Sequence, residues 1–157
     1  MKLRPLLLTV LALGLAAPVC AIAAPEVVRS GPAAAPISGD VVVRNVGGAD
    51  FAYASGVPGA ATAGDTHGQT IDALTKLLKG LHDQGFEAGD IVMMRVFLVA
   101  DPATGKMDFA GMNSAFAQFF GAAGQPNKPS RTTVQITALA APGSLVEIEA
   151  QAVKEHR

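Results

Sequence analysis

Two segments whose apolar residues recur at helical spacing constrain the fold of this chain more than any other feature. The first segment carries on one face Ile71, Leu74, Leu77, Leu78 and Leu81. The second segment carries in the same way Phe109, Met112, Phe116, Phe119 and Phe120. An apolar stripe of this width is stable only when another element covers it, so both predicted helices need a partner surface.

Residues that start and stop helices mark the bounds of both segments. The first helix is expected to begin near Thr66, whose hydroxyl can cap free backbone N–H groups, and to end at Gly85. Asp108 is expected to cap the second helix in the same manner. Residues 121–129, which contain glycine and proline, then interrupt that helix.

Strand-like runs around the helices supply the surface that covers them. They span residues 40–46, 51–55, 91–100, 131–139 and 145–154. Turn residues between the first two runs favour a hairpin. The order β-β-α-β-α-β-β predicts an α+β fold in which two helices cover one face of a mixed sheet, while the opposite face stays uncovered.

The first 23 residues have the layout of a secretory signal peptide. A short basic start precedes an uncharged apolar run at residues 6–19, and the cleavage pattern AIA follows at residues 21–23. The run of 14 residues is too short to cross a bilayer core of about 30 Å. Cleavage before Ala24 is therefore expected. It leaves an N-terminal arm at residues 24–36, a domain at residues 37–157, and a periplasmic or secreted location.

Two alternatives to this cleavage stay open. The apolar run could serve as an uncleaved membrane anchor, which its short length disfavours. Cys20 could carry a lipid, but Val19 stands where a lipidated cysteine needs a small residue before it. After cleavage, no part of the remaining chain is expected to bind a membrane.

The mature chain is predicted to have few sources of stability beyond its core. Cys20 is the only cysteine and leaves with the signal peptide, so no disulfide is expected. The remaining 134 residues contain no tryptophan, and many of their apolar residues are alanine, so subunit contacts are expected to support a modest core. Loss of Lys2 and Arg4 leaves ten basic residues against 13 acidic ones, a net charge of −3, which disfavours nucleic acid as a partner.

The last two predicted strands carry Arg131 and Glu147 on their polar sides. If the apolar sides meet the helices, both charged residues project from the uncovered face. If the strands also form a hairpin centred on residues 141–142, Glu147 lies about five residues, or roughly 16 Å, from Arg131 along the sheet. One small ligand could then contact both residues only across a subunit boundary.

Two interpretations of these charges stay open. Most surface charges are only solvated, so Arg131 and Glu147 could be ordinary residues of a wet sheet face. Alternatively, the face is an assembly surface with a charged site embedded in it. Metal chemistry is disfavoured because His67, His82 and His156 lack the spacing of metal ligands, and no cofactor is expected.

The C-terminal strands resemble the signature of the reactive intermediate deaminase (Rid) family, also called YjgF. The resemblance lies in PSRTTV at residues 129–134 and VEIEA at residues 146–150. Three further pieces occur in the order that the family has: ASG at residues 54–56, GDIV at residues 89–92, and Asn113 in the second helix. Together these pieces extend the resemblance over nearly the whole mature chain, residues 37–154.

The resemblance implies a chorismate-mutase-like fold and a homotrimer whose sheets form a central barrel, with a cleft at each subunit boundary. It also implies an enzyme, a deaminase that hydrolyses reactive 2-imino and 2-enamino acids to 2-oxo acids and ammonia without a cofactor. By this resemblance, Arg131 holds the substrate carboxylate, and Glu147 handles water and protons. Gly56, Asn113 and Thr133 are the further substrate-binding positions.

The chain departs from the family pattern at two positions. Many family members carry a tyrosine near the start of the first strand, where this chain has three valines after Asp40. They often carry a cysteine where Thr133 stands. One alternative function stays open beside the enzyme. It is a non-catalytic trimer that binds small carboxylates or, as a holdase-like module, exposed apolar segments.

Overall fold

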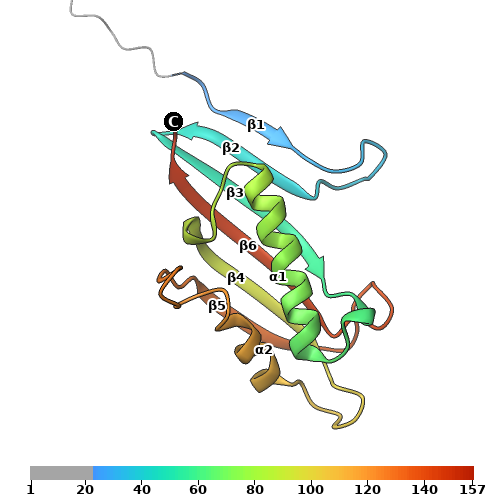
Figure 1. Ribbon diagram of the computed structural model, residues 1–157. Coiled ribbons are helices and arrows are strands. Elements are labelled where there is room, and N and C mark those ends of the chain that lie inside the picture. The colour runs from blue at the N-terminus through green and yellow to red at the C-terminus, as the bar shows by residue number, and fades with distance from the viewer. Residues whose placement is uncertain (1–22) are drawn as a thin grey trace, which may run out of the picture.

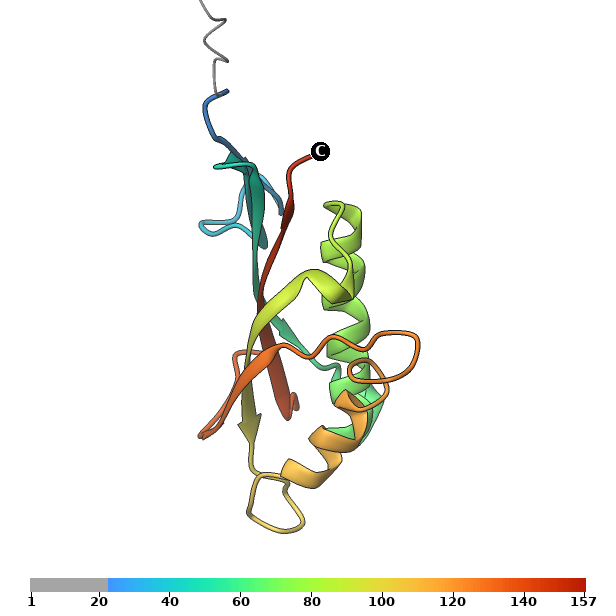
Figure 2. The ribbon, with the colours of Figure 1, turned by 90° about the vertical axis from the view of Figure 1, so that its left-hand side faces the viewer.

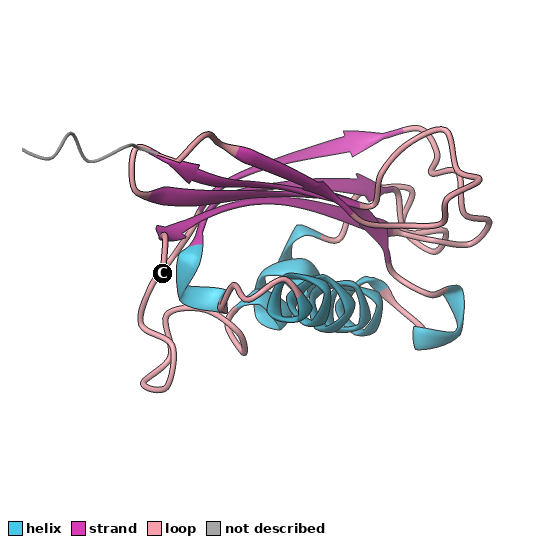
Figure 3. Cartoon of the chain, turned by 90° about the horizontal axis from the view of Figure 1, so that it is seen from above, coloured by secondary structure: helices cyan, strands magenta, loops and turns pink. Residues whose placement is uncertain are grey.

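The computed structural model describes residues 23–157 and has two layers, a six-stranded sheet and a pair of helices (Figure 1). The signal peptide predicted for residues 1–23 lies, apart from Ala23, outside this part of the chain. Both helices stand on the same side of the sheet (Figure 2), and in the described part no helix covers the other face (Figure 3). No helix between residues 23 and 157 is long and apolar enough to cross a membrane.

The sheet has the strand order β1-β2-β3-β6-β4-β5. Its strands are β1 (Glu26–Arg29), β2 (Asp40–Val46), β3 (Ala49–Pro58), β4 (Ile91–Val99), β5 (Ser130–Ile136) and β6 (Val146–Glu155). The helices are α1 (Thr66–Asp83) and α2 (Phe109–Phe116), with the short 3-10 turns η1 (Ala61–Ala63) and η2 (Ala88–Asp90). Only β4 and β5 pair in parallel, so the sheet is mixed, as predicted. β1 lies within the predicted arm and adds an edge strand to the expected five.

The last two strands do not form the hairpin that was considered for them, because β4 lies between β5 and β6. The chain leaves β4, passes through α2 and returns as β5 parallel to β4, and a parallel return requires such a crossover. β6 then pairs with both β3 and β4 in antiparallel fashion. In this register Met94 of β4 stands opposite Arg131 on one side and Ala150 on the other.

Arg131 lies on the helix-covered face of the sheet, which contradicts the predicted uncovered face. Its register partners Met94 and Ala150 are both buried beneath the helices, and directly opposed residues point to the same face. Val134 on the other side of β5 is exposed instead. The reason is that α2 presents aromatic rings to this edge strand, and a guanidinium can stack on them. Glu147 does project from the open face, between two buried neighbours of β6.

α1 packs its leucine stripe against the sheet. Three of these side chains are fully buried: Leu74, Leu77 and Leu81. The helix begins at Thr66 as predicted, but Asp65 caps it by accepting a hydrogen bond from the Gly68 N–H over 2.9 Å. The chain turns away just after the helix at Gly85, whose φ of 83° favours glycine.

α2 is capped by Asp108, as predicted, which accepts a hydrogen bond from the Gly111 N–H over 2.8 Å. The helix ends at Phe116, earlier than the apolar stripe suggests, and residues 117–119 continue as turns. Phe116 and Phe120 are nevertheless both buried, with ring centroids 5.9 Å apart. The stripe therefore packs as predicted although its last turn is not α-helical.

A buried carboxylate joins the β2–β3 hairpin to the end of the chain. Asp50 is 2% exposed and accepts hydrogen bonds from Arg44 Nη1 over 3.1 Å and from the Asn45 N–H over 2.9 Å. His156 Nδ1 lies 2.7 Å from Asp50 Oδ1. Burial by itself raises the pKa of Asp50, but these hydrogen bonds and the charge of His156 outweigh it, so the pKa is lowered.

We predict that Asp50→Ala lowers the free energy of unfolding by about 2–4 kcal/mol at neutral pH, because it leaves the Arg44 and Asn45 donors without their acceptor. Since the folded pKa is lowered, this stabilisation is complete above the unfolded pKa of about 3.9 and is lost as the pH falls through the folded pKa. Denaturant unfolding at matched protein concentration should show that the difference in free energy of unfolding between wild type and Asp50→Ala becomes smaller in acid.

The control for this prediction is Asp83→Ala, which removes an exposed helical ion pair with Lys79. It should change the free energy of unfolding by less than about 0.5 kcal/mol. Equal effects of the two substitutions would contradict the assigned role of Asp50.

Candidate functional site

The structure brings Arg131 and Asn113 together where β5 meets α2. Arg131 Nη2 donates a hydrogen bond to Asn113 Oδ1 over 2.5 Å. The guanidinium carbon lies 4.5 Å from the ring centroid of Phe116 and 5.8 Å from that of Phe109. Phe109, Asn113 and Phe116 are spaced four and three residues apart, which places them on one face of α2. We call Arg131 and these three residues the arginine cluster.

The guanidinium of the arginine cluster has no acidic partner in the described part of the chain. Arg44 pairs with Asp50 at 3.1 Å and Arg95 pairs with Glu149 at 3.4 Å. Between residues 23 and 157, no carboxylate forms such a pair with Arg131. Burial lowers the pKa of Arg131, because a surrounding of low polarity disfavours the charged form. A bound anion would restore the favourable interactions that the guanidinium loses on leaving water.

A pocket of about 360 Å³ opens beside the arginine cluster. Its lining residues are Asn113, Phe116, Ala117, Phe120, Lys128, Pro129 and Arg131. Thr133 lies two residues further along the same face of β5 but does not line the pocket. Its Oγ1 is buried without a hydrogen-bond partner among the described residues, so the hydroxyl faces protein. The pocket thus offers a small carboxylate a cation, an amide and aromatic surface.

Glu147 and Gly56 meet on the open face of the sheet. Glu147 pairs in register with Pro58, and the register of β3 shifts between Ala54 and Val57, next to Gly56. A Cβ atom at Gly56 would lie 2.6 Å from Glu147 Cδ, which is closer than real Cβ contacts allow. The glycine therefore lets the carboxylate lie against bare backbone. We call Gly56 and Glu147 the glutamate cluster.

The environment of Glu147 favours its protonated form. Partial burial raises the pKa of Glu147, and the negative charge of Glu149 raises it further. Glu149 projects from the same face two residues along β6, and it is itself paired with Arg95. A carboxylate whose pKa is raised accepts a proton more readily than that of an ordinary glutamate.

The two clusters lie on opposite faces of the sheet. Across β4, Arg131 is in register with Ala150, which is three residues from Glu147 along β6. Two strand spacings and three residue rises separate the two backbone positions by roughly 14 Å. Because the side chains also point to opposite faces, one small ligand cannot contact Arg131 and Glu147 of the same chain. Each chain therefore holds two incomplete groups of the predicted site residues.

The phenylalanines that frame Arg131 were not expected at the site. The helical stripe predicts Phe109 in the core, but its side chain is 44% exposed beneath the guanidinium. Phe116 is buried as predicted and also stacks on Arg131. The sequence does contain one signal that this helix face borders a site, namely the position of Asn113 within the apolar stripe. A polar side chain on a buried helix face needs a hydrogen-bond partner.

The three histidines do not form a centre. His67 contacts α2, His82 lies beside Glu87, and His156 lies beside Asp50. Among residues 23–157, no three His, Cys, Asp or Glu side chains are grouped so that they could hold a metal ion. Within the described part of the chain, the arginine and glutamate clusters thus carry the chemistry that the sequence singled out.

Comparison with known proteins finds a matching family and matching solved structures. The model of the family described as Endoribonuclease L-PSP matches residues 33–154. A Mycobacterium tuberculosis member of the YjgF/YER057c/UK114 family is 30% identical; the match covers 82% of this chain and 98% of that one, with a TM-score of 0.61. A YjgF-family protein from Neisseria meningitidis is 27% identical, with coverages of 84% and 98% and a TM-score of 0.63. No curated protein matches the chain.

We predict that Glu149→Gln lowers the pKa of Glu147 toward its ordinary value, because the substitution removes a neighbouring charge that disfavours ionisation. Since the folded pKa of Glu147 is raised, the folded state loses stability as the pH rises through that pKa. The Glu149→Gln variant should lose less stability over this pH range than the wild type. Titration of the Glu147 carboxyl carbon by NMR measures the shift. Glu87→Gln, at the exposed turn η2, is the control and should leave the curve unchanged. An unshifted curve in Glu149→Gln would rule out the coupling.

Proposed function

Because the chain belongs to the endoribonuclease L-PSP family, also called the YjgF or Rid family, we propose that it hydrolyses 2-imino and 2-enamino acids to 2-oxo acids and ammonia. The observation that carries the proposal is the partly buried guanidinium of Arg131, which has no acidic partner among residues 23–157. It lies beside a pocket lined by Asn113 and Phe116. A small carboxylate is the ligand that supplies the missing charge.

Arg131 binds the carboxylate of the substrate in this proposal. Its planar fork presents parallel N–H donors to both carboxylate oxygens, which the ammonium group of lysine cannot do. Stacking on Phe116 and the hydrogen bond to Asn113 hold the plane of the guanidinium. The fixed carboxylate aims the C=N carbon at a bound water molecule, and the gain in rate is mainly one of positioning.

Glu147 acts as the general base and then as the acid. It takes a proton from the water molecule as the water oxygen bonds to the C=N carbon, and it passes this proton to the nitrogen, which gives a carbinolamine. Glu147 then takes the proton of the carbinolamine hydroxyl and delivers it to the amine nitrogen, so that the C–N bond breaks, ammonia leaves and the C=O group forms. An enamine enters the same route after a proton is added to its carbon. The raised pKa of Glu147 suits it to both proton transfers.

We place each site at a boundary between subunits of a homotrimer. The arginine cluster of one subunit faces the glutamate cluster of its neighbour, since either cluster alone holds half of the required groups. The open sheet face supports this arrangement because it carries apolar side chains such as Tyr53 and Val134, which are 44% and 40% exposed. Such a face is suited to burial against the sheets of other subunits.

We predict that Arg131→Ala lowers kcat/KM for imine hydrolysis about a hundredfold or more, because the substrate loses its charged hydrogen bonds. Arg131→Lys should recover little of this loss, since lysine cannot bind both carboxylate oxygens. The assay generates 2-iminopropanoate from alanine with an amino acid oxidase and measures ammonia release above the spontaneous rate. Light scattering should show the same assembly for all variants.

The control for this assay is Arg29→Ala, which removes an exposed arginine from the edge strand β1 and should leave the rate unchanged. Equal rates in wild type and Arg131→Ala would refute the proposal. Binding of small carboxylates without ammonia release would favour a non-catalytic module. Cleavage of RNA with no hydrolysis of imines would favour the activity in the family's description instead.

We predict that inactive subunits complement one another if Arg131 and Glu147 act across a boundary. Arg131→Ala and Glu147→Gln should each be inactive alone. A boundary that takes Arg131 from one variant and Glu147 from the other is intact, so trimers refolded from an equal mixture should recover about one quarter of the wild-type sites. Recovery of no activity from trimers shown to be mixed would contradict shared sites.

We also propose that the chain is exported and that residues 1–23 are removed. The mature protein recovered from the periplasm of a Gram-negative host should begin at Ala24, as read by N-terminal sequencing. Full-length protein in the membrane fraction would favour the uncleaved anchor. Lipid attached at Cys20 would favour the lipoprotein.

A further inference from the structure

A buried glutamine of α1 holds the segment that leads into β6. Gln69 is 1% exposed. Its Nε2 donates to the Gly64 carbonyl over 2.9 Å and to the Gly143 carbonyl over 3.2 Å, and its Oε1 accepts a hydrogen bond from the Leu145 N–H over 2.8 Å. Leu145 lies two residues before Glu147. One side chain thus uses both ends of its amide to fix the backbone just before the glutamate cluster.

The end of β3 is held to the same segment. Gly59 lies directly against Gln69, since a Cβ atom at Gly59 would lie 2.6 Å from the Gln69 carbonyl oxygen, which is closer than real contacts allow. The Gly59 N–H donates to the Val146 carbonyl over 2.9 Å. The buried Ser144 Oγ donates to the Gly59 carbonyl over 2.6 Å. We call Gly59, Gln69, Ser144 and Leu145 the strand-end clamp.

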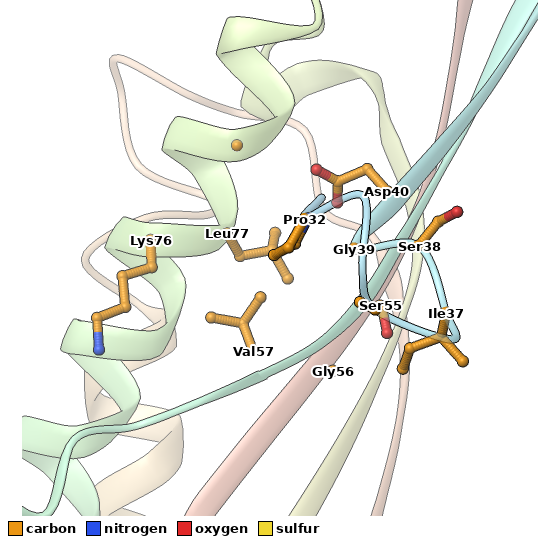
Figure 4. A pocket seen from close by; sticks show the side chains of 12 residues that line it. Pro32, Ile37, Ser38, Gly39, Asp40, Ser55, Gly56, Val57, Lys76 and Leu77 are labelled. Carbon is orange, nitrogen blue, oxygen red and sulfur yellow. The ribbon is translucent and has the colours of Figure 1, made fainter. Parts of the chain in front are cut away.

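Apolar packing alone does not fix this part of the sheet. A pocket of about 380 Å³ lies between α1, β3 and the segment that joins β1 to β2 (Figure 4). Gly56 and Val57 of β3 and Leu77 of α1 all line it (Figure 4), so the strand and the helix are less closely packed here than in the core. The register of β3 also shifts between Ala54 and Val57. The polar contacts of the clamp therefore supply the support that packing does not.

We propose that Gln69 is a positioning residue for the reaction, because the strand-end clamp fixes the place of the Glu147 carboxylate. The inference rests on the proposed function. Glu147 follows directly after Val146, whose carbonyl the clamp binds. It is in register with Pro58, which directly precedes Gly59. A displacement of the clamp therefore reaches both strands of the glutamate cluster, and a misplacement of about 1 Å can lower a rate about a hundredfold.

The arginine cluster is held by other contacts. Asn113 and Phe116 of α2 fix the guanidinium of Arg131, and β4 separates β5 from β6. A defect in the clamp should therefore slow the proton transfers of Glu147 and leave binding of the substrate carboxylate in place. This division separates a positioning role from a general loss of stability.

The variants are chosen to separate these two effects. Gln69→Met keeps an unbranched side chain of similar length but removes all three hydrogen bonds. Thr70→Val, at the next residue of α1, is the matched control, because Thr70 is also buried and its Oγ1 donates to the Thr66 carbonyl over 2.6 Å within the helix. Ser144→Ala removes a single hydrogen bond of the clamp and serves as the milder variant if Gln69→Met fails to fold.

Gln69→Met should lower kcat for imine hydrolysis about tenfold or more and leave KM within about twofold, because Arg131 still binds the carboxylate. NMR titration of the Glu147 carboxyl carbon should show its pKa moving toward the ordinary value, since a loosened strand end admits water to the carboxylate. Ser144→Ala should change kcat and this pKa in the same directions by smaller amounts. Thr70→Val should leave both unchanged.

Mixed trimers show which half of the site is lost. Gln69→Met refolded with Arg131→Ala should recover about one quarter of the wild-type sites, because some boundaries combine an intact Arg131 with a well-placed Glu147. Gln69→Met refolded with Glu147→Gln should give no activity above the mean of the two variants, since every boundary then lacks a well-placed Glu147.

Three outcomes overturn the role of Gln69. Equal losses of kcat in Gln69→Met and Thr70→Val overturn it, since a weakened α1 explains them. An unshifted Glu147 titration in the clamp variants overturns it, and so does recovery of activity with Glu147→Gln in place of Arg131→Ala. Failure of the wild type to hydrolyse imines overturns the proposed function, and the titration then decides by itself whether the clamp positions Glu147.

Discussion

The pairing of β6 with both β3 and β4 is the constraint on which the rest of the structure depends (Figure 1). β6 is the last strand in the chain, yet it lies inside the sheet. One of its faces is buried under the helices, and its other face carries Glu147 and Glu149. Its register with β3 brings Glu147 against Gly56, and its register through β4 fixes where Arg131 stands. The position of one strand thus sets the geometry of both clusters.

The elements of the fold could be predicted from the sequence, but their neighbours in the sheet could not. Apolar spacing locates both helices and five strands because it reports local burial. Strand order depends on contacts between segments that are distant in the sequence. A hairpin of β5 and β6 would be the simplest arrangement, but α2 acts as a crossover that brings β5 back beside β4. The residue that caps α1 is Asp65 and not the expected Thr66, because the side chains of both residues can accept a backbone hydrogen bond.

The site residues could be identified from the sequence, but the face of the sheet from which Arg131 projects could not be predicted. β5 has β-branched residues on both sides, so its alternation is weak, and only the rings of Phe109 and Phe116 decide that the guanidinium turns toward α2. Arg131 and Glu147 therefore point away from each other within a chain. In the proposed trimer, opposite faces of neighbouring sheets supply the two halves, so catalysis depends on assembly. The same geometry explains why neither half looks complete by itself.

The late position of β6 in the chain also shapes how the protein is made. Until residues 146–155 have been synthesised, β3 is paired with β2 alone and β4 with β5 alone, so each has one edge of unmatched backbone groups. Both edges are open to strands from other molecules during that interval. Molecules that lack β6 thus expose two strand edges that favour aggregation, whereas pairing of β6 covers both edges at once.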